Sequence, residues 1–159
     1  MTIPSKPTGS SAGKGDAVAI ESVASVLQRE LDDVIAEWFG RIQKAPDLMD
    51  IKMSREDRTG HLRLLLTEII KRLRMDAGTT APISEAAAKH GDLRRNQGYT
   101  PAMAVEESRL LEVSIFTILQ NNANFLEFKV LLLDVATIVD EVDAQLKEQM
   151  LRFTIAGRC

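Results

Sequence analysis

Apolar residues recur at intervals of three and four along most of the chain, which is the period of an amphipathic α-helix. Between residues 17 and 44, one such stripe begins at Ile20 and reaches Ile42. It should end at Ala45, because a residue that precedes a proline avoids the α conformation. No segment alternates apolar and polar residues between hairpin turns, as strands do. The pattern predicts an all-α protein.

Cap and stop residues divide the rest of the chain into further helices. Ser54 and Ser84 each precede a helical segment and offer an N-cap oxygen, and Thr100 with Pro101 is a third start signal. Gly98 is typical of a helix end, because glycine adopts positive φ without strain. The predicted fold is a helical bundle of about five helices, at residues 17–44, 54–75, 85–96, 101–121 and about 122–153.

The chain divides into three regions by composition. Residues 1–16 hold two prolines and three glycines and almost nothing apolar, so they predict a flexible tail. A helical domain should occupy residues 17–145, and residues 146–159 should form the end of the last helix. Apolar residues make up 45% of the chain and charged residues 27%, which is typical of a soluble globular protein.

Charge and hydropathy exclude several classes of partner. The formal net charge is −3, so there is no basic excess to favour a nucleic-acid partner. The longest apolar runs, such as residues 130–133, are far shorter than the ~20 residues that span a bilayer, so we expect no membrane partner. The polar start of the chain has no apolar stretch typical of a secretory signal. These observations predict a cytoplasmic protein.

The last predicted helix carries a heptad repeat, with residues spaced alternately by four and three. The repeat consists of Phe128, Leu132, Val135, Val139, Val142, Leu146, Gln149 and Phe153. A helix of about 30 residues is ~45 Å long, whereas the bundle before it is only ~30 Å across. The final turns, with Phe153, should therefore protrude, and the stripe predicts a homodimer that relays a signal to an output domain. The alternative is that the stripe is the inner face of the bundle.

Few residues are candidates for chemistry. Neither His61 nor His90 is followed by a histidine or carboxylate at i+3 or i+4, the spacing of a helical metal site, and Cys159 has no partner for a disulfide. Glu106 and Glu107 are adjacent and so lie on different helix faces, which does not suit an acid–base pair. We therefore expect no enzyme activity, metal or cofactor. A free-standing ligand- or haem-binding helical protein stays an alternative, because an all-helical chain with histidines is also the pattern of a haem globin.

Residues 88–99, followed by 105–111, resemble the N-terminal domain of the RsbT co-antagonist (RsbRD-type) regulators. The shared pattern is a His-Gly pair, an arginine, a Gln-Gly-Tyr turn, and then a glutamate and a leucine on the next helix. The matching positions are His90, Arg94, Gln97, Gly98, Tyr99 and Glu106. Trp38 and His61 fit the same family more loosely, and the resemblance covers about residues 20–145.

The resemblance implies an all-helical domain akin to non-haem globins. Such domains stand at the N-terminus of stressosome regulators and of bacterial sensor histidine kinases, so the implied function is a sensory or regulatory module whose partner is a kinase or regulatory output domain. Residues 149–157 also look like the helix before the phosphoacceptor histidine of a kinase dimerisation domain, although that histidine is absent. His90 and Arg94 lie one turn apart, and we expect Glu106 to accept a hydrogen bond from one of them. That contact either joins two helices or lines a ligand or signal pocket.

Overall fold

The protein, as a computed structural model, is described for residues 17–76 and 78–156. The predicted tail 1–16 and the end of the chain from residue 157 lie outside these ranges. The elements, in chain order, are α1 (Val23–Arg29), α2 (Leu31–Ile42), α3 (Pro46–Asp50), α4 (Arg55–Thr59), α5 (Leu62–Leu73), α6 (Glu85–Asn96), α7 (Pro101–Asn121), the 3₁₀ helix η1 (Ala123–Phe125) and α8 (Phe128–Ala156). The prediction of an all-α bundle with a long last helix is confirmed.

The predicted cap residues start their helices as expected. The Ser54, Ser84 and Thr100 side chains accept hydrogen bonds from the backbone N–H groups three residues later, at 3.0, 2.9 and 3.2 Å. At the far end of α6, Gly98 has φ +93°, which an L-residue adopts only with strain. These local signals explain why the bounds of α6 and α7 agree with the predicted 85–96 and 101–121.

The first two predicted helices are each broken into shorter ones. The predicted helix 17–44 starts only at Val23, after the Ser22 cap, and is interrupted at Glu30 between α1 and α2. The residues before Ser22 are extended instead: the Glu21 N–H donates to the Phe125 carbonyl at 2.7 Å, in an isolated parallel bridge next to the connection between α7 and α8. The predicted helix 54–75 is likewise divided into α4 and α5 near Gly60.

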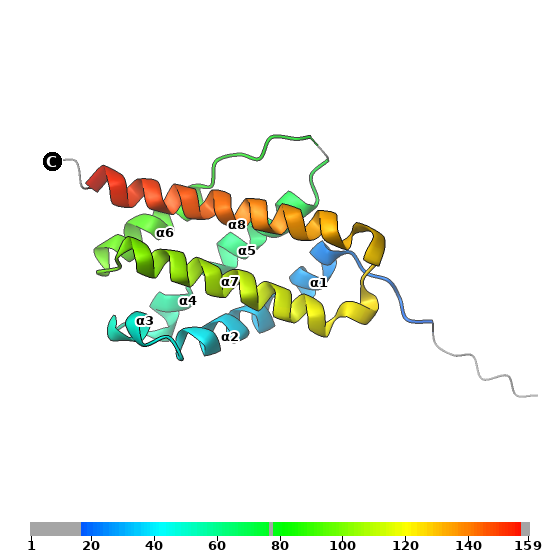
Figure 1. The fold of residues 1–159 in the computed structure, drawn as a ribbon, viewed down its shortest axis with the longest axis horizontal. Helices are drawn as coiled ribbons and strands as arrows, with labels where there is room; N and C mark the ends of the chain where they lie inside the picture. The colour runs from blue at the N-terminus through cyan, green and yellow to red at the C-terminus, as the bar shows by residue number, and fades with distance from the viewer. Residues whose placement is uncertain (1–16, 77, 157–159) are drawn as a thin grey trace, which may run out of the picture.

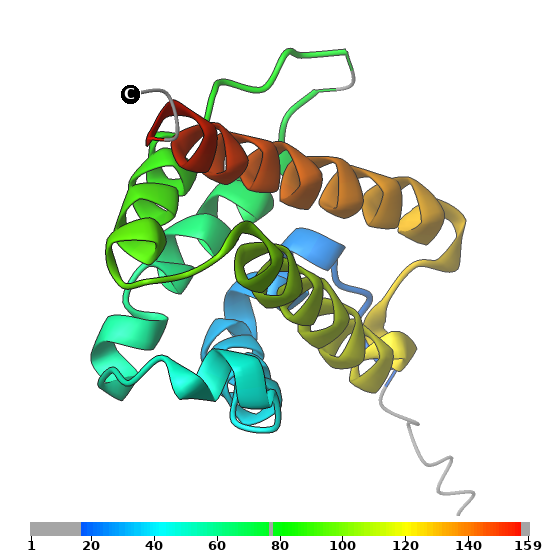
Figure 2. The same cartoon turned by 60° about the vertical axis from the view of Figure 1, so that its left-hand side comes forward.

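The core is built from the apolar faces of α1, α2, α5, α7 and α8. Among its most deeply buried members are Trp38 and Ile42 of α2, Ile69 of α5, Ile115 of α7 and Ile138 of α8, and α2 packs against α7. Figure 1 shows α7 and α8 running in opposite directions side by side. In Figure 2 the red C-terminal end of α8 crosses over α6, whereas the orange half extends away from α6. The C-terminal half of α8 is therefore the part that the bundle holds.

The burial of α8 corrects the prediction for its heptad stripe. Val142 is only 2% exposed and belongs to the core of its own chain, and Phe153 is half-buried against that core. Arg95 of α6 also donates to the Arg152 carbonyl at 2.8 Å. The expectation that the last turns with Phe153 protrude is thus wrong, because α6 extends along them. The stripe belongs largely to the inner face: Val135, Val139 and Leu146 are also half-buried.

The exposed part of α8 is its first part instead. Phe128 is 80% exposed and Leu132 74%, and the neighbouring Leu133 is exposed as well. None of the residues 128–137 is buried, whereas the buried residues among 138–155 all lie between Ile138 and Gln149. In the part of the chain that the structure describes, no helix has the length and apolar character needed to cross a bilayer.

Candidate functional site

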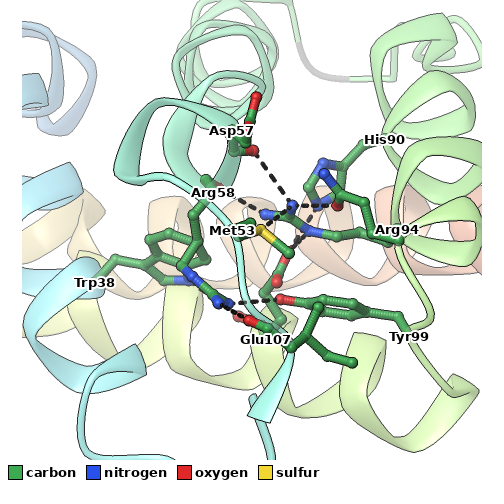
Figure 3. Close-up of polar contacts among 10 residues, drawn as sticks. Trp38, Met53, Asp57, Arg58, His90, Arg94, Tyr99 and Glu107 are labelled. Atoms are coloured by element: carbon green, nitrogen blue, oxygen red, sulfur yellow. Dashed lines mark hydrogen bonds and ion pairs between the residues drawn. The ribbon is translucent and has the colours of Figure 1, made fainter. Parts of the chain in front are cut away.

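A cluster of charged side chains lies inside the bundle, where α4, α6 and α7 meet (Figure 3). Arg58 comes from α4, His90 and Arg94 from α6, and Glu107 from α7. All four are at most 5% exposed, and Arg94 is completely buried. Charged groups are costly to bury unless they are paired and hydrogen-bonded, so each of these four side chains needs partners inside the bundle.

Glu107 joins the two residues of α6. Its Oε1 lies 2.8 Å from His90 Nε2 and accepts a hydrogen bond from Arg94 Nε at 2.9 Å. Burial opposes ionisation of this carboxyl group, but the hydrogen bond from His90 and the charge of Arg94 outweigh it, so the pKa of Glu107 lies below its usual range. Glu107 is therefore the buried anion of the cluster at neutral pH.

Arg94 uses the rest of its guanidinium group to hold α4 and the end of α6. It donates to the Arg58 carbonyl at 2.6 Å and to Gln97 Oε1 at 2.8 Å, and its guanidinium lies 5.0 Å from the centre of the Tyr99 ring. An arginine side chain has five N–H donors in a fixed planar array, which suits a site with several acceptors in different directions. Lysine has no such array, so it does not replace these contacts.

Arg58 and Trp38 close the cluster on the side of α2 and α3. Arg58 donates to the Tyr99 hydroxyl at 3.0 Å and to the Ile51 carbonyl at 2.6 Å. The indole N–H of Trp38 donates to the backbone carbonyl of Glu107 at 3.2 Å. Burial, and after it the charge of Glu107, raises the pKa of Tyr99, so its phenol stays protonated at neutral pH.

His61 lies beside the cluster but outside its hydrogen bonds. Its ring centre is 5.7 Å from that of His90, with an angle of 51° between the ring planes. Burial, followed by the charges of His90 and Arg94, lowers the pKa of His61, so the neutral form is favoured at pH 7. The sequence placed this residue only loosely in the family pattern, and the structure brings it next to the motif histidine.

Four of the six motif residues meet in the cluster, a fifth forms the turn beside it, and the sixth lies apart. His90, Arg94, Gln97 and Tyr99 meet in the cluster, and Gly98 forms the turn that brings Tyr99 back to Arg94. Glu106 is different: it is half-buried at the surface and forms an ion pair with Arg109 at 2.7 Å. The acceptor that contacts His90 and Arg94 is therefore not Glu106, as expected, but the next residue, Glu107, because that position faces inward on α7.

The sequence analysis missed Glu107, Arg58 and two glutamines of α8 as parts of this region. A usable signal was present for Glu107, which follows Ala104 and precedes Leu111 at helical spacing and so lies on the apolar stripe of α7. A charged residue on a buried stripe needs a buried partner. Gln145 and Gln149 interrupt the apolar stripe of α8 in the same way, and both are buried.

The region offers little room for a large ligand. A cavity of about 10 Å³ lies beside His90 and Glu107, and it is lined further by Trp38, Gln145 and Gln149. Cavities that hold cofactors and drug-sized ligands are ~300–1,000 Å³. Haem therefore does not fit beside His90. In the two described ranges, no group of three or more His, Cys, Asp or Glu side chains is placed to hold a metal ion.

Comparison with protein-family models, with curated proteins and with solved structures gives no match to this chain. The resemblance to the RsbRD-type N-terminal domain thus rests on the motif residues alone.

Proposed function

We propose that this chain is an N-terminal sensory or regulatory module of a bacterial signalling protein, in the first place a sensor histidine kinase. In this proposal the module passes a signal from the buried cluster to α8, and α8 passes it to an output domain. The observation that supports the proposal most strongly is that one helix, α6, takes part in both contacts. His90 and Arg94 of α6 belong to the cluster, and the residues that follow each of them, Gly91 and Arg95, contact α8.

The contact between α6 and α8 is close enough to couple their positions. A Cβ atom on Gly91 would lie 2.8 Å from the Cα atom of Gln149, so the two backbones touch with no side chain between them. One turn later, Arg95 donates to the Arg152 carbonyl. Close-packed helices move between discrete arrangements rather than deforming gradually. A change at His90 or Arg94 that shifts α6 would accordingly shift the C-terminal half of α8.

A second copy of the chain is the partner that we propose for the exposed start of α8. Phe128, Leu132 and Leu133 project from the first two turns, and Val130 is also exposed. Exposed apolar patches of this kind often mark interaction surfaces. Of the predicted heptad stripe, Phe128 and Leu132 thus stay accessible, while the remainder packs within the chain. Pairing there would leave the C-terminal end of α8 free to lead into an output domain.

The dimer is tested by light scattering at tens of micromolar, with Leu132→Glu as the disrupting variant. The matched control is Leu64→Glu, which changes an exposed leucine of α5 and leaves α8 unaltered. We expect a dimer for the unmodified chain and for L64E, and a monomer for L132E. A monomeric unmodified chain, or a dimer that survives L132E, would contradict the proposed dimer.

The relay is tested by spin-label distances within the chain, on a Cys159→Ser background with labels at Lys147 on α8 and Glu37 on α2. Arg94→Lys should shift or broaden the distance distribution, because lysine cannot make the contacts that hold α6. Arg109→Lys, in an exposed ion pair, is the control and should leave the distribution unchanged. Identical distributions for R94K and the unmodified chain would refute the relay.

The type of output domain decides between two versions of the proposal. A histidine-containing helix with an ATP-binding domain, encoded after Cys159, would support the sensor kinase. A small phosphorylatable α/β domain there would support a stressosome-type regulator instead. Either output would receive the signal through the same helix.

A further inference from the structure

We propose that a cavity between α5, α8 and the connection before α6 binds a free α-amino acid with an apolar side chain, held by Arg72 and Glu141. This binding site lies outside the cluster around Glu107, and the signalling proposal does not require it. Three observations support it: a cavity of the size of a small ligand, charged side chains in its wall that lack partners, and an apolar wall beside them.

The cavity has the volume of a site for a small molecule. It measures about 360 Å³, at the lower end of the ~300–1,000 Å³ that is typical of ligand sites. Its walls come from the C-terminal part of α5, from residues 81–84 and from Glu141 of α8. In Figures 1 and 2 the green connection between α5 and α6 stands out from the helices on the side of α8. A small ligand therefore fits between this connection and the two helices.

Four charged side chains line the cavity, two of each sign. Glu68, Lys71 and Arg72 come from α5, and Glu141 comes from α8. Glu68 and Arg72 are four residues apart, a spacing at which opposite charges on a helix pair. Yet within residues 17–76 and 78–156 none of the four forms an ion pair, and Glu68 accepts a hydrogen bond from the Ser84 hydroxyl instead. Charges of both signs are thus available to a ligand.

Arg72 and Glu141 are the members of this set that most need a partner. The Nε atom of Arg72 is buried and has no hydrogen-bond partner in the described part of the chain. Glu141 is only 6% exposed, and the hydrogen bond that its carboxylate accepts from Gln145 Nε2 is long, at 3.4 Å. Burial accordingly raises the pKa of Glu141. A ligand that accepts from Arg72 and donates to Glu141 would offset the cost of burying both groups.

The balance of charge in the wall favours a zwitterion. An anion would be repelled by Glu68 and Glu141, and a cation would be repelled by Lys71 and Arg72. An α-amino acid carries a carboxylate and an ammonium group on the same carbon atom, so it offers an acceptor to Arg72 and a donor to Glu141 together. Hydrogen bonds between a guanidinium group and a carboxylate are among the strongest in proteins.

The rest of the wall favours an apolar side chain on that amino acid. Met75, Ala81 and Pro82 line the cavity, and Ile83 beside them is 76% exposed. Burying apolar ligand surface against these residues is favourable, and a ligand without a side chain gains nothing from it. Leucine, methionine and phenylalanine are therefore the expected ligands, whereas glycine, which has the same two charges, is not.

The first test is isothermal titration calorimetry of the full chain at pH 7 with L-leucine, L-methionine and L-phenylalanine. We expect at least one of the three to bind with a stoichiometry of one. Three probes each lack one recognised group: the amide of that amino acid lacks the carboxylate, its desamino analogue lacks the ammonium group, and glycine lacks the side chain. Each should bind about tenfold more weakly or worse, as the loss of a hydrogen bond to a charged group or of apolar burial predicts. Absence of binding by all three amino acids, or a probe that binds as tightly as the amino acid, would overturn the proposal.

The second test locates the ligand through ratios of affinities. Arg72→Met keeps an apolar stem but removes the guanidinium group, so R72M should bind the amino acid and its amide with nearly equal affinity. E141Q should likewise bind the amino acid and its desamino analogue with nearly equal affinity. Arg74→Met and Asp140→Asn, at exposed positions beside the two residues, are the controls and should keep the ratios of the unmodified chain. A substitution that only disturbs the fold weakens all ligands alike and leaves the ratios unchanged. Unchanged ratios in either R72M or E141Q would therefore contradict the assigned site.

Discussion

Gly91 of α6 lies directly against the backbone of Gln149 in α8: a Cβ atom added to Gly91 would be 2.8 Å from Gln149 Cα and 3.0 Å from its carbonyl oxygen. Real Cβ atoms do not approach a backbone so closely. Glycine is therefore required here for contact between two helices rather than for an unusual φ.

Gly91→Ala should destabilise the fold by about 1–3 kcal/mol, because the added methyl group forces α6 and α8 apart in a close-packed interface. The matched control is Gly40→Ala, which also lies inside a helix but has nothing within 4 Å of the added Cβ. G40A should be stabilised by about 0.5–1 kcal/mol, since alanine is the better helix former. Urea unfolding, followed by the fluorescence of Trp38, measures the free energy of unfolding of both variants. Equal effects of the two substitutions would contradict the close contact.

Glu107→Gln should cost about 3–5 kcal/mol, the range for removing one partner of a buried ion pair, because Arg94 then stays buried without a counter-charge. Glu106→Gln, one residue away on the same helix, should cost less than about 1 kcal/mol, since its ion pair with Arg109 is exposed. Chemical unfolding of the two variants at pH 7 provides the comparison. Similar costs would show that Glu107 is not the central anion.

His61 should titrate below 6.5, the usual value for histidine, because burial and the nearby cations of the cluster lower its pKa. A histidine with a depressed folded-state pKa contributes stability that is present above 6.5 and is lost as pH falls through the folded pKa. The free energy of unfolding should thus decrease from pH 7 to pH 5, and His61→Gln should remove part of that decrease. NMR titration of the ring protons, with the urea-unfolded chain as reference, measures the pKa directly. A value at or above the reference would contradict the assignment.

Glu141 should affect the pH dependence of stability in the opposite sense to His61, because burial, and to a smaller extent Glu68, raises its pKa. A carboxyl group with a raised folded-state pKa lowers stability at pH 7, and this loss disappears as pH falls below the unfolded value. Glu141→Gln should therefore raise Tm at pH 7 by up to about 3 °C, the shift that ~1 kcal/mol produces in a chain of this size. Its effect should vanish near pH 3. Asp140→Asn, at the exposed neighbouring position, is the control and should change Tm little at either pH.

Local signals made α6 and α7 predictable almost to the residue. The Ser84 and Thr100 side chains accept hydrogen bonds from backbone N–H groups only three residues away, and Gly98 ends α6 through its own backbone conformation. The break at Glu30 had no such signal, since neither glycine nor proline stands there. The extended residues before α1 were unpredictable for another reason: the Glu21 N–H pairs with Phe125, about a hundred residues away.

The candidate site was predictable in part. The motif identified His90 and Arg94, and helical spacing put them on one face, but the choice between Glu106 and Glu107 depends on the rotation of α7 about its axis. That rotation is set by the packing of α7 against α1, α2, α3 and α8. In the same way, the heptad stripe of α8 identified apolar positions but not their neighbours, so Val142 and Phe153 were assigned to a partner although their own chain covers them.

The uneven burial of α8 has a consequence for local unfolding. Backbone amides exchange with solvent through local opening, and segments with few buried contacts open most easily. Among residues 138–155 of α8, the buried ones lie between Ile138 and Gln149, while residues 128–137 have none. Amide protons near the start of α8 should therefore exchange with deuterium sooner than those around Gln145, although the start lies in the middle of the chain. Dimer formation at Leu132 would slow exchange at the start of α8 as protein concentration rises, so the exchange pattern would report both the strength and the location of that contact.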